Sequence, residues 1–260
     1  MLVTTEGPMA PNISACINYM RTIWSDEKFF ASDPFVPPVP WQEHLYSSEK
    51  TLNIGFYTFD GYSEPPPAYQ RAVLDTVALL RSQGHNLVEF QVPRPAEAFE
   101  LFVASSTGDG GTFLKQKLDL AVLEAMPKNC VELRETFAKI EEYRHDFVRA
   151  MRRQNLDAIV CPAFGSIAPH VGKANDMISA TCYTSLYNLI DFPAGVVQVT
   201  RVSKKDESEV REMPDVDKWA KMTRDECNNS VGLPISVQIA APPFREELCL
   251  RLLRDVEKTS

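Results

Sequence analysis

Short apolar runs alternate with stretches of helical periodicity along the chain. Runs of strand length occupy residues 53–57, 86–92, 158–162, 196–202 and 234–241. Apolar residues spaced three to four apart predict helices at residues 8–24, 66–83, 112–126, 130–154, 176–190, 215–228 and 245–257. This alternation predicts the α/β class, with a mixed, mostly parallel sheet that carries helices on both faces.

The segment from residue 53 to residue 92 is the clearest unit. Val73, Val77 and Leu80 recur on one face of its helix, and Gly84 follows as a stop signal. A strand, a helix and a second strand form a βαβ unit, whose two strands pair in parallel. We therefore expect a parallel pair at this point of the sheet.

Proline-rich and highly charged stretches interrupt the pattern. Residues 34–41 predict an extended connector, because proline continues neither a helix nor a central strand. Two PxxP spacings in this stretch leave a proline-rich docking motif as a weaker alternative. The charge run KKDESE at residues 204–209 is typical of a solvated loop. Adjacent carboxylates on a helix point about 100° apart, so two such pairs are also predicted to be solvated. These pairs are Glu141 with Glu142 and Glu246 with Glu247.

Composition excludes some classes of function. The chain has 260 residues and a net charge of −8, which argues against nucleic-acid binding because that needs clustered Lys and Arg. No apolar run reaches the ~18 residues that span a bilayer, and no signal peptide is visible.

The six cysteines form no CxxC pair, which favours buried free thiols in a reducing compartment. The four histidines show no metal-ligand spacing. We expect a cytoplasmic or intracellular protein, soluble or peripheral to membranes.

The segment SSTGDGG at residues 105–111 has the composition of a catalytic loop. A serine on a glycine-rich turn can act as a nucleophile beneath converging backbone N–H groups. However, the nearest lysines, Lys115 and Lys117, fall on a predicted helix surface, and no histidine is close in sequence. A connection between helices that needs glycine is the favoured interpretation.

Several blocks resemble the fatty-acid amide hydrolases of the amidase-signature family in their order and spacing. They are EGPMA at 6–10, DPFVPPVPWQEHLY at 33–46, IGFYTFDGY at 54–62, YNLIDFPAGVV at 187–197 and SVGLPISVQ at 230–238. The resemblance implies that residues 1–260 are the C-terminal portion of a single amidase domain. Residues 34–41 would then be its proline-rich connector and residues 112–154 a helical segment.

The resemblance also implies what this chain lacks. In that family, a lysine and a serine in a cis linkage activate a nucleophilic serine for attack on an amide or ester carbonyl. All three residues precede the GPMA block, which begins here at Gly7, so no catalytic residue is assigned to this chain. The family needs no metal or organic cofactor, and we expect none.

An acyl-binding pocket is the part of the family's site that this chain could supply. By resemblance, the substrate-binding residues are Tyr62, Trp219, Thr181, Ile178 and Ser185. Packing in the core remains an alternative for Tyr62 and Trp219, since large aromatic side chains often fill cores. The family's apolar membrane-docking helices would fall within residues 115–136, where this chain is charged, which predicts weak or no membrane association.

Three hypotheses follow. The chain is part of a serine amidase that hydrolyses fatty-acid or other small amides or esters, and an N-terminal half completes its site for a small-molecule or acyl-amide substrate. Alternatively, it is a catalytically inactive, amidase-derived binding or interaction protein, or a truncated product. Transcript sequence upstream of Met1 discriminates among them, because a Ser/Gly loop with a lysine there favours the first. A sheet cut in half would expose a strand edge, which favours a homo-oligomer.

Overall fold

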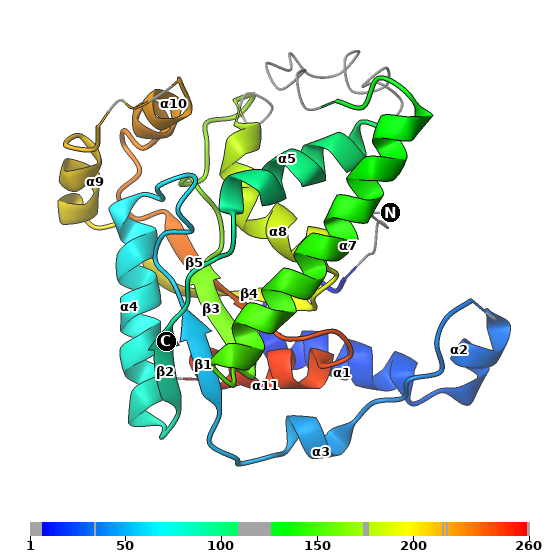
Figure 1. Ribbon diagram of the computed structural model, residues 1–260. Coiled ribbons are helices and arrows are strands. Elements are labelled where there is room, and N and C mark those ends of the chain that lie inside the picture. The colour runs from blue at the N-terminus through cyan, green and yellow to red at the C-terminus, as the bar shows by residue number, and fades with distance from the viewer. Residues whose placement is uncertain are drawn as a thin grey trace.

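A computed structural model shows a five-stranded sheet at the centre of the protein (Figure 1). The structure describes residues 7–33, 35–108, 126–173, 177–214, 216 and 218–258. The strands are β1 (Asn53–Phe56), β2 (Asn86–Glu89), β3 (Ala158–Pro162), β4 (Ala194–Arg201) and β5 (Pro234–Ala240), in the order β2-β1-β3-β5-β4. β1 pairs in parallel with β2 and β3, whereas β5 pairs antiparallel with β3 and β4. Because only β5 is reversed, the sheet is mixed and mostly parallel, as predicted.

Side chains alternate between the two faces of the sheet and so divide the core into two clusters. Ile54, Phe56 and Val160 pack with three helices, α1 (Ile13–Trp24), α4 (Pro67–Ser82) and α11 (Glu246–Glu257). Tyr57, Ile159 and Cys161 pack on the opposite face. They contact α5 (Pro95–Ser106), α7 (Cys130–Arg153) and α8 (Cys182–Ile190). Helices on both faces are thus confirmed.

Close packing requires a glycine in β1. A Cβ atom at Gly55 would lie 2.7 Å from Cδ1 of Leu156 and 3.2 Å from Cβ of Phe90. Both contacts are shorter than a relaxed carbon–carbon separation of about 3.5–4.0 Å. Leu156 and Phe90 can therefore pack this closely over β1 only because residue 55 has no side chain.

Most predicted helices form, with shifted ends. The helix expected at residues 8–24 begins only at Ile13, because the Asn12 side chain accepts the N–H of Ala15 and caps it. The helix expected at 176–190 divides into a 3-10 turn, η3 (Ile178–Thr181), and α8, and the one at 215–228 is α10 (Lys218–Glu226). The helix expected at 112–126 lies almost entirely outside the described residues. Helices α2 (Glu27–Ser32), α3 (Glu43–Tyr46) and α5 had no prediction.

Helix α11 anchors the segment between Ile13 and Tyr46 at three points. Its Glu257 accepts the N–H of Ile13 at 2.8 Å, and its Glu247 accepts the N–H of Gln42 at 2.8 Å. The ring of Tyr46 also lies within 5.0 Å of the Arg21 guanidinium and 4.6 Å of the Arg254 guanidinium. Residues 35–41 between these contacts form neither helix nor strand, as expected of a connector.

The prediction that Glu246 and Glu247 are both solvated is wrong for Glu247. Its side chain is buried, with 1% of the residue exposed, because it faces the backbone of Gln42, just after the connector, rather than water. Glu246 is half-buried, and burial raises the pKa of its carboxyl. Glu141 and Glu142 are exposed, as predicted.

The loop expected at residues 204–209 is instead a helix, α9 (Lys204–Val210). Ser203 and Asp206 form a reciprocal capping box, in which each side chain accepts the backbone N–H of the other. The Asp206 carboxylate also receives two guanidinium hydrogen bonds from Arg71 of α4, at 3.1 and 2.8 Å. Burial favours a higher pKa for Asp206, but the hydrogen bonds from Arg71 and Ser203 outweigh it and hold the pKa below its usual value.

We predict that Asp206→Ala lowers the free energy of unfolding by about 2–3 kcal/mol, because it removes both the cap and the Arg71 pair. The matched control is Asp75→Ala, since Asp75 pairs with the same Arg71 at 3.5 Å but is exposed. Its loss should cost about 0.5 kcal/mol or less. Urea denaturation measures both.

The same pair predicts a dependence on pH. Because the folded-state pKa of Asp206 is depressed, its contribution is present above the unfolded pKa of about 3.9 and is lost as pH falls through the folded pKa. The stability difference between wild type and Asp206→Ala should therefore shrink below about pH 4. A difference that stays constant down to pH 2 would contradict this assignment.

Candidate functional site

The residues that follow the carboxyl ends of β1 and β3 gather at one end of the sheet. The turn with Tyr62 follows β1, and η3 and α8 follow β3. Figure 1 shows α5, α8 and α10 at this end, whereas α3 lies at the opposite end. Open α/β sheets bind ligands beyond the carboxyl ends of their strands, so this end is the candidate site.

Asp60 shapes the turn that carries Tyr62. Its Oδ1 atom accepts the backbone N–H groups of Tyr62, at 2.8 Å, and Ser63, at 3.1 Å. Gly61 lies between Asp60 and Tyr62, and its backbone has a φ of +95°, a left-handed conformation that favours glycine. The Asp60 carboxyl is buried, and burial raises its pKa despite these two hydrogen bonds. Asp60 was not singled out in the sequence, although Asp followed by Gly is a recognised turn signal.

Tyr62 lies at the surface end of this turn. Its ring packs on Phe99 of α5 with 5.4 Å between ring centroids, and 38% of the residue is exposed. A core residue would be buried, so the core-packing alternative does not apply to Tyr62. Tyr183 of α8 fixes the turn from the other side, because its hydroxyl donates to the Ser63 carbonyl at 2.7 Å.

Ile178, Thr181 and Ser185 lie on adjoining turns of η3 and α8. The Thr181 hydroxyl donates to the Ile178 carbonyl at 2.6 Å, and the Ser185 hydroxyl donates to the Cys182 carbonyl at 3.2 Å. Both hydroxyls are therefore satisfied within their own helices. Polar residues at these two positions are compatible with an apolar wall, although Ser185 itself is buried.

Trp219 lies on α10, which packs against η3. Its side chain is half-buried, and the Lys218 ammonium lies 5.7 Å from the ring centroid. Glu226 at the other end of α10 accepts both the backbone N–H of His170, at 2.7 Å, and its Nδ1, at 2.8 Å. These hydrogen bonds lower the pKa of Glu226 and hold α10 to the segment that follows β3. The structure thus brings α10 beside η3, while the turn that carries Tyr62 is joined to α8 by the hydrogen bond between Tyr183 and Ser63.

A network of buried hydroxyl and thiol groups joins α8 to the sheet. Tyr57 and Tyr187 share a hydrogen bond of 3.1 Å, and Tyr187 lies 3.6 Å from the Cys161 sulfur. Gln238 of β5 completes the group by donating to the Tyr183 carbonyl at 2.9 Å. Burial raises the pKa of the Cys161 thiol and of both tyrosines, so all three stay neutral near pH 7. We interpret this network as structural, since a nucleophilic thiol needs a lowered pKa.

The remaining cysteines are also free. Cys182, Cys227 and Cys249 are buried like Cys161, whereas Cys130 is exposed. The prediction of buried free thiols therefore holds for four positions, while Cys16 on α1 is half-buried. It fails at Cys130, where the thiol is exposed at the first position of α7.

Ser105 and Ser106 lie on the last turn of α5 rather than on a catalytic loop. Both hydroxyls donate to the Phe102 carbonyl, at 3.2 and 2.8 Å. No hydrogen bond to a basic side chain is found for either among the described residues, which favours the connection over the nucleophile. Residues 109–111 of this segment lie outside the described residues.

Among the described residues, no three His, Cys, Asp or Glu side chains converge as metal ligands. None of the described helices is both long enough and apolar enough to cross a membrane.

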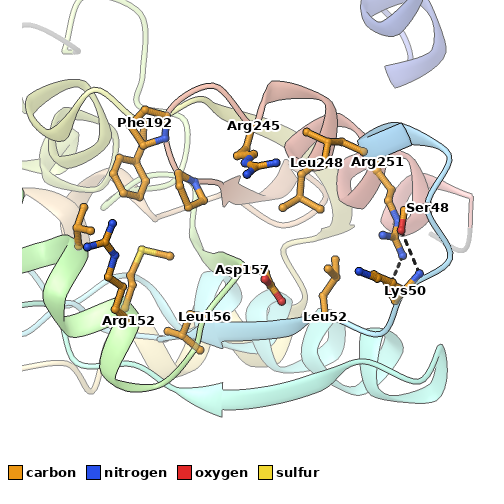
Figure 2. Close-up of a pocket in the computed structure, with 15 residues that line it drawn as sticks. Ser48, Lys50, Leu52, Arg152, Leu156, Asp157, Phe192, Arg245, Leu248 and Arg251 are labelled. Atoms are coloured by element: carbon orange, nitrogen blue, oxygen red, sulfur yellow. Dashed lines mark hydrogen bonds between the residues drawn. The ribbon is translucent and has the colours of Figure 1, made fainter. Parts of the chain in front are cut away.

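A cavity of about 630 Å³ lies at the opposite end of the sheet from the candidate site (Figure 2). Leu52, directly before β1, and Leu156, two residues before β3, line it together with residues at the end of α7 and the start of α11. None of the five predicted substrate-binding residues contributes to this cavity.

Comparison with known proteins gives the family. A family model described as Amidase matches residues 1–142 and 120–250. The chain belongs to this amidase family. It is 37% identical to "Fatty acid amide hydrolase 1" of Caenorhabditis elegans, with 99% of this chain and 52% of the relative covered. It is 34% identical to "Fatty-acid amide hydrolase 1" of Sus scrofa, with 97% of this chain and 50% of the relative covered.

Solved structures show the same fold. A fatty acid amide hydrolase superposes with a TM-score of 0.79 at 20% identity, covering 96% of this chain and 47% of that chain. A 6-aminohexanoate cyclic dimer hydrolase superposes with a TM-score of 0.58 at 14% identity, covering 86% of this chain and 48% of that chain. The chain spans about half the length of the relatives and structures that it matches.

We predict that Asp60→Ala lowers the free energy of unfolding by about 2 kcal/mol, because two backbone N–H groups lose their acceptor. Asp60→Asn keeps an acceptor oxygen and removes a buried charge, so it should cost less than half as much. Urea denaturation at pH 7 compares the two. Equal losses for both variants would show that the charge, and not the turn geometry, is what Asp60 supplies.

Proposed function

We propose that this chain is part of a serine amidase that hydrolyses fatty-acid or other small amides or esters, and that it supplies one wall of the acyl pocket. The observation that carries the proposal is the 37% identity to a fatty acid amide hydrolase over 99% of the chain. The proposed wall consists of Tyr62, Ile178, Thr181, Ser185 and Trp219.

The arrangement of these residues supports the proposal. Tyr62 follows β1, while Ile178, Thr181 and Ser185 follow β3, and both segments lie beyond the carboxyl ends of parallel strands. Tyr62 and Trp219 are only partly buried, so each has ring surface that a ligand can cover. A half-covered aromatic ring is typical of a pocket wall rather than of a core.

The catalytic residues would come from another part of the amidase domain. The proposed chemistry needs a lysine that deprotonates a bridging serine, and a second serine that attacks the carbonyl. No residue of this chain is proposed for these roles. We propose that residues 1–260 act as the C-terminal portion of one domain, and that an N-terminal half covers an open edge of its sheet.

We predict that the chain alone does not hydrolyse a fatty-acid anilide and is not labelled by a fluorophosphonate probe. Pocket binding without an activated nucleophile leaves rates orders of magnitude below those of a complete site. Stoichiometric labelling of Ser105 or Ser106 would overturn the assignment of catalysis to another segment.

The proposal itself is tested by a chimera in which this chain replaces the matching half of the Caenorhabditis elegans relative. The chimera should hydrolyse long-chain amides. Tyr62→Ala in the chimera should lower kcat/KM for long acyl chains about tenfold more than it does for short ones. Tyr19→Ala is the control, because Tyr19 is exposed on α1 and should change neither rate. A chimera with a cooperative melt but no turnover would favour the catalytically inactive binding protein instead.

We predict that Trp219→Ala weakens binding of oleamide to the chain by about 1–3 kcal/mol, measured by calorimetry. Because Trp219 is half-buried, the same change should cost about 1–2 kcal/mol of stability, below the ~3–5 kcal/mol of a core tryptophan. Trp24→Ala is the matched control on α1. Unchanged binding with Trp219→Ala would remove Trp219 from the pocket.

A further inference from the structure

The cavity at the amino ends of β1 and β3 has walls of two kinds. Its volume of about 630 Å³ lies within the range of small-molecule sites, about 300–1,000 Å³. Most of the lining is apolar, and these side chains come from four separate parts of the chain. They are Leu45, Leu52, Val148, Met151, Leu156, Phe192, Pro242, Pro243 and Leu248.

The charged residues of the lining are mostly basic. Lys50, Arg152, Arg245 and Arg251 contribute four cations, against the single carboxylate of Asp157. This local excess of positive charge is the reverse of the chain's net charge of −8. Figure 2 shows Arg152 and Arg251 on opposite sides of the cavity, with Arg245 between them.

Two of these charges are already held by the protein. Arg251 is buried, with 4% exposed, and it donates to the Lys50 carbonyl at 2.9 Å, with Asp255 at 3.8 Å. Asp157, which Figure 2 places between Leu156 and Leu52, accepts the backbone N–H of Asn53 at 2.9 Å. Arg152 and Arg245 are exposed at the rim, and no ion pair is found for either among the described residues. These two guanidinium groups are therefore available to an incoming anion.

We propose that this cavity binds an alkyl carboxylate, with its chain against the leucine and proline walls and its head group between Arg152 and Arg245. Inorganic anions would leave the apolar walls uncovered, and a neutral alkane would leave the guanidinium groups without a partner. A guanidinium matches a carboxylate through two parallel hydrogen bonds. This site is separate from the proposed acyl pocket and does not depend on its assignment.

The experiment is calorimetric titration of the chain with decanoate, below the concentration at which decanoate aggregates. We expect saturable binding of one decanoate per chain. Arg152→Gln and Arg245→Gln should each weaken it about fivefold, the upper range for one exposed ion pair. Arg153→Gln is the matched control, because Arg153 is the exposed neighbour on α7 and does not line this cavity. It should leave decanoate binding within twofold of wild type.

Two further measurements distinguish the contribution of the apolar walls from that of the arginines at the rim. They also distinguish binding in this cavity from binding in the proposed acyl pocket. Val148→Trp fills the cavity from a half-buried position and should abolish binding of decanoate, whereas decanol binding should be insensitive to both arginine variants. Tyr62→Ala and Trp219→Ala should leave decanoate binding unchanged. The proposal is overturned if binding is not saturable, if Arg152→Gln and Arg245→Gln bind like wild type, or if Tyr62→Ala and Trp219→Ala remove the binding.

Discussion

Burial of β3 on both faces is the constraint on which the other elements depend. All five of its residues are buried, and β1 and β5 pair with its two edges. Ala158 and Val160 belong to the cluster with α4 and α11, whereas Ile159 and Cys161 belong to the cluster with α7 and α8. At about 25 cal/mol per Å² of buried apolar surface, such a strand stabilises both helix layers together. The segments that follow β1 and β3 are therefore fixed relative to one another by the same strand.

This constraint explains why the candidate site needs polar contacts of its own. The turn after β1 exposes Gly61 and Tyr62, so apolar burial cannot define its shape. Two acceptors define it instead, the buried carboxylate of Asp60 and, through Tyr183, the carbonyl of Ser63. The ring of Tyr62 is thus held in one place although much of it is open to solvent. An aromatic ring that is positioned but not covered is suited to contact a ligand without first reorganising.

The sheet was predictable from the sequence, and several charged residues were not. In β1, β3, β4 and β5, apolar residues of the run are buried, so local pattern and final environment agree. In the edge strand β2, Leu87 is half-buried and the other three residues are exposed. Asp206 and Glu247 lie in charged runs that locally resemble solvated surface, yet both are buried because Arg71 and the N–H of Gln42 reach them from distant segments. No spacing within residues 204–209 or 246–247 carries that information. The site residues were identified by resemblance alone, and Asp60 and His170, which hold them, have no periodicity that would mark them.

The two ends of the sheet differ in chemistry because of the directions in which the strands run. Because four strands run the same way, the segments after their carboxyl ends collect at one edge and the segments before their amino ends collect at the other. The end after the carboxyl termini of these strands carries aromatic rings and hydroxyl groups that are hydrogen-bonded within their own helices. The end before their amino termini carries the four basic residues of the cavity. Leu52 precedes β1 and Tyr62 follows it, so the two edges are joined by a strand whose residues 54–56 are buried. A buried, fully paired strand changes neither length nor register when a ligand binds at one end. Occupancy of one end of the sheet should therefore leave the geometry of the other end unchanged, so the two proposed sites should act independently in this fold.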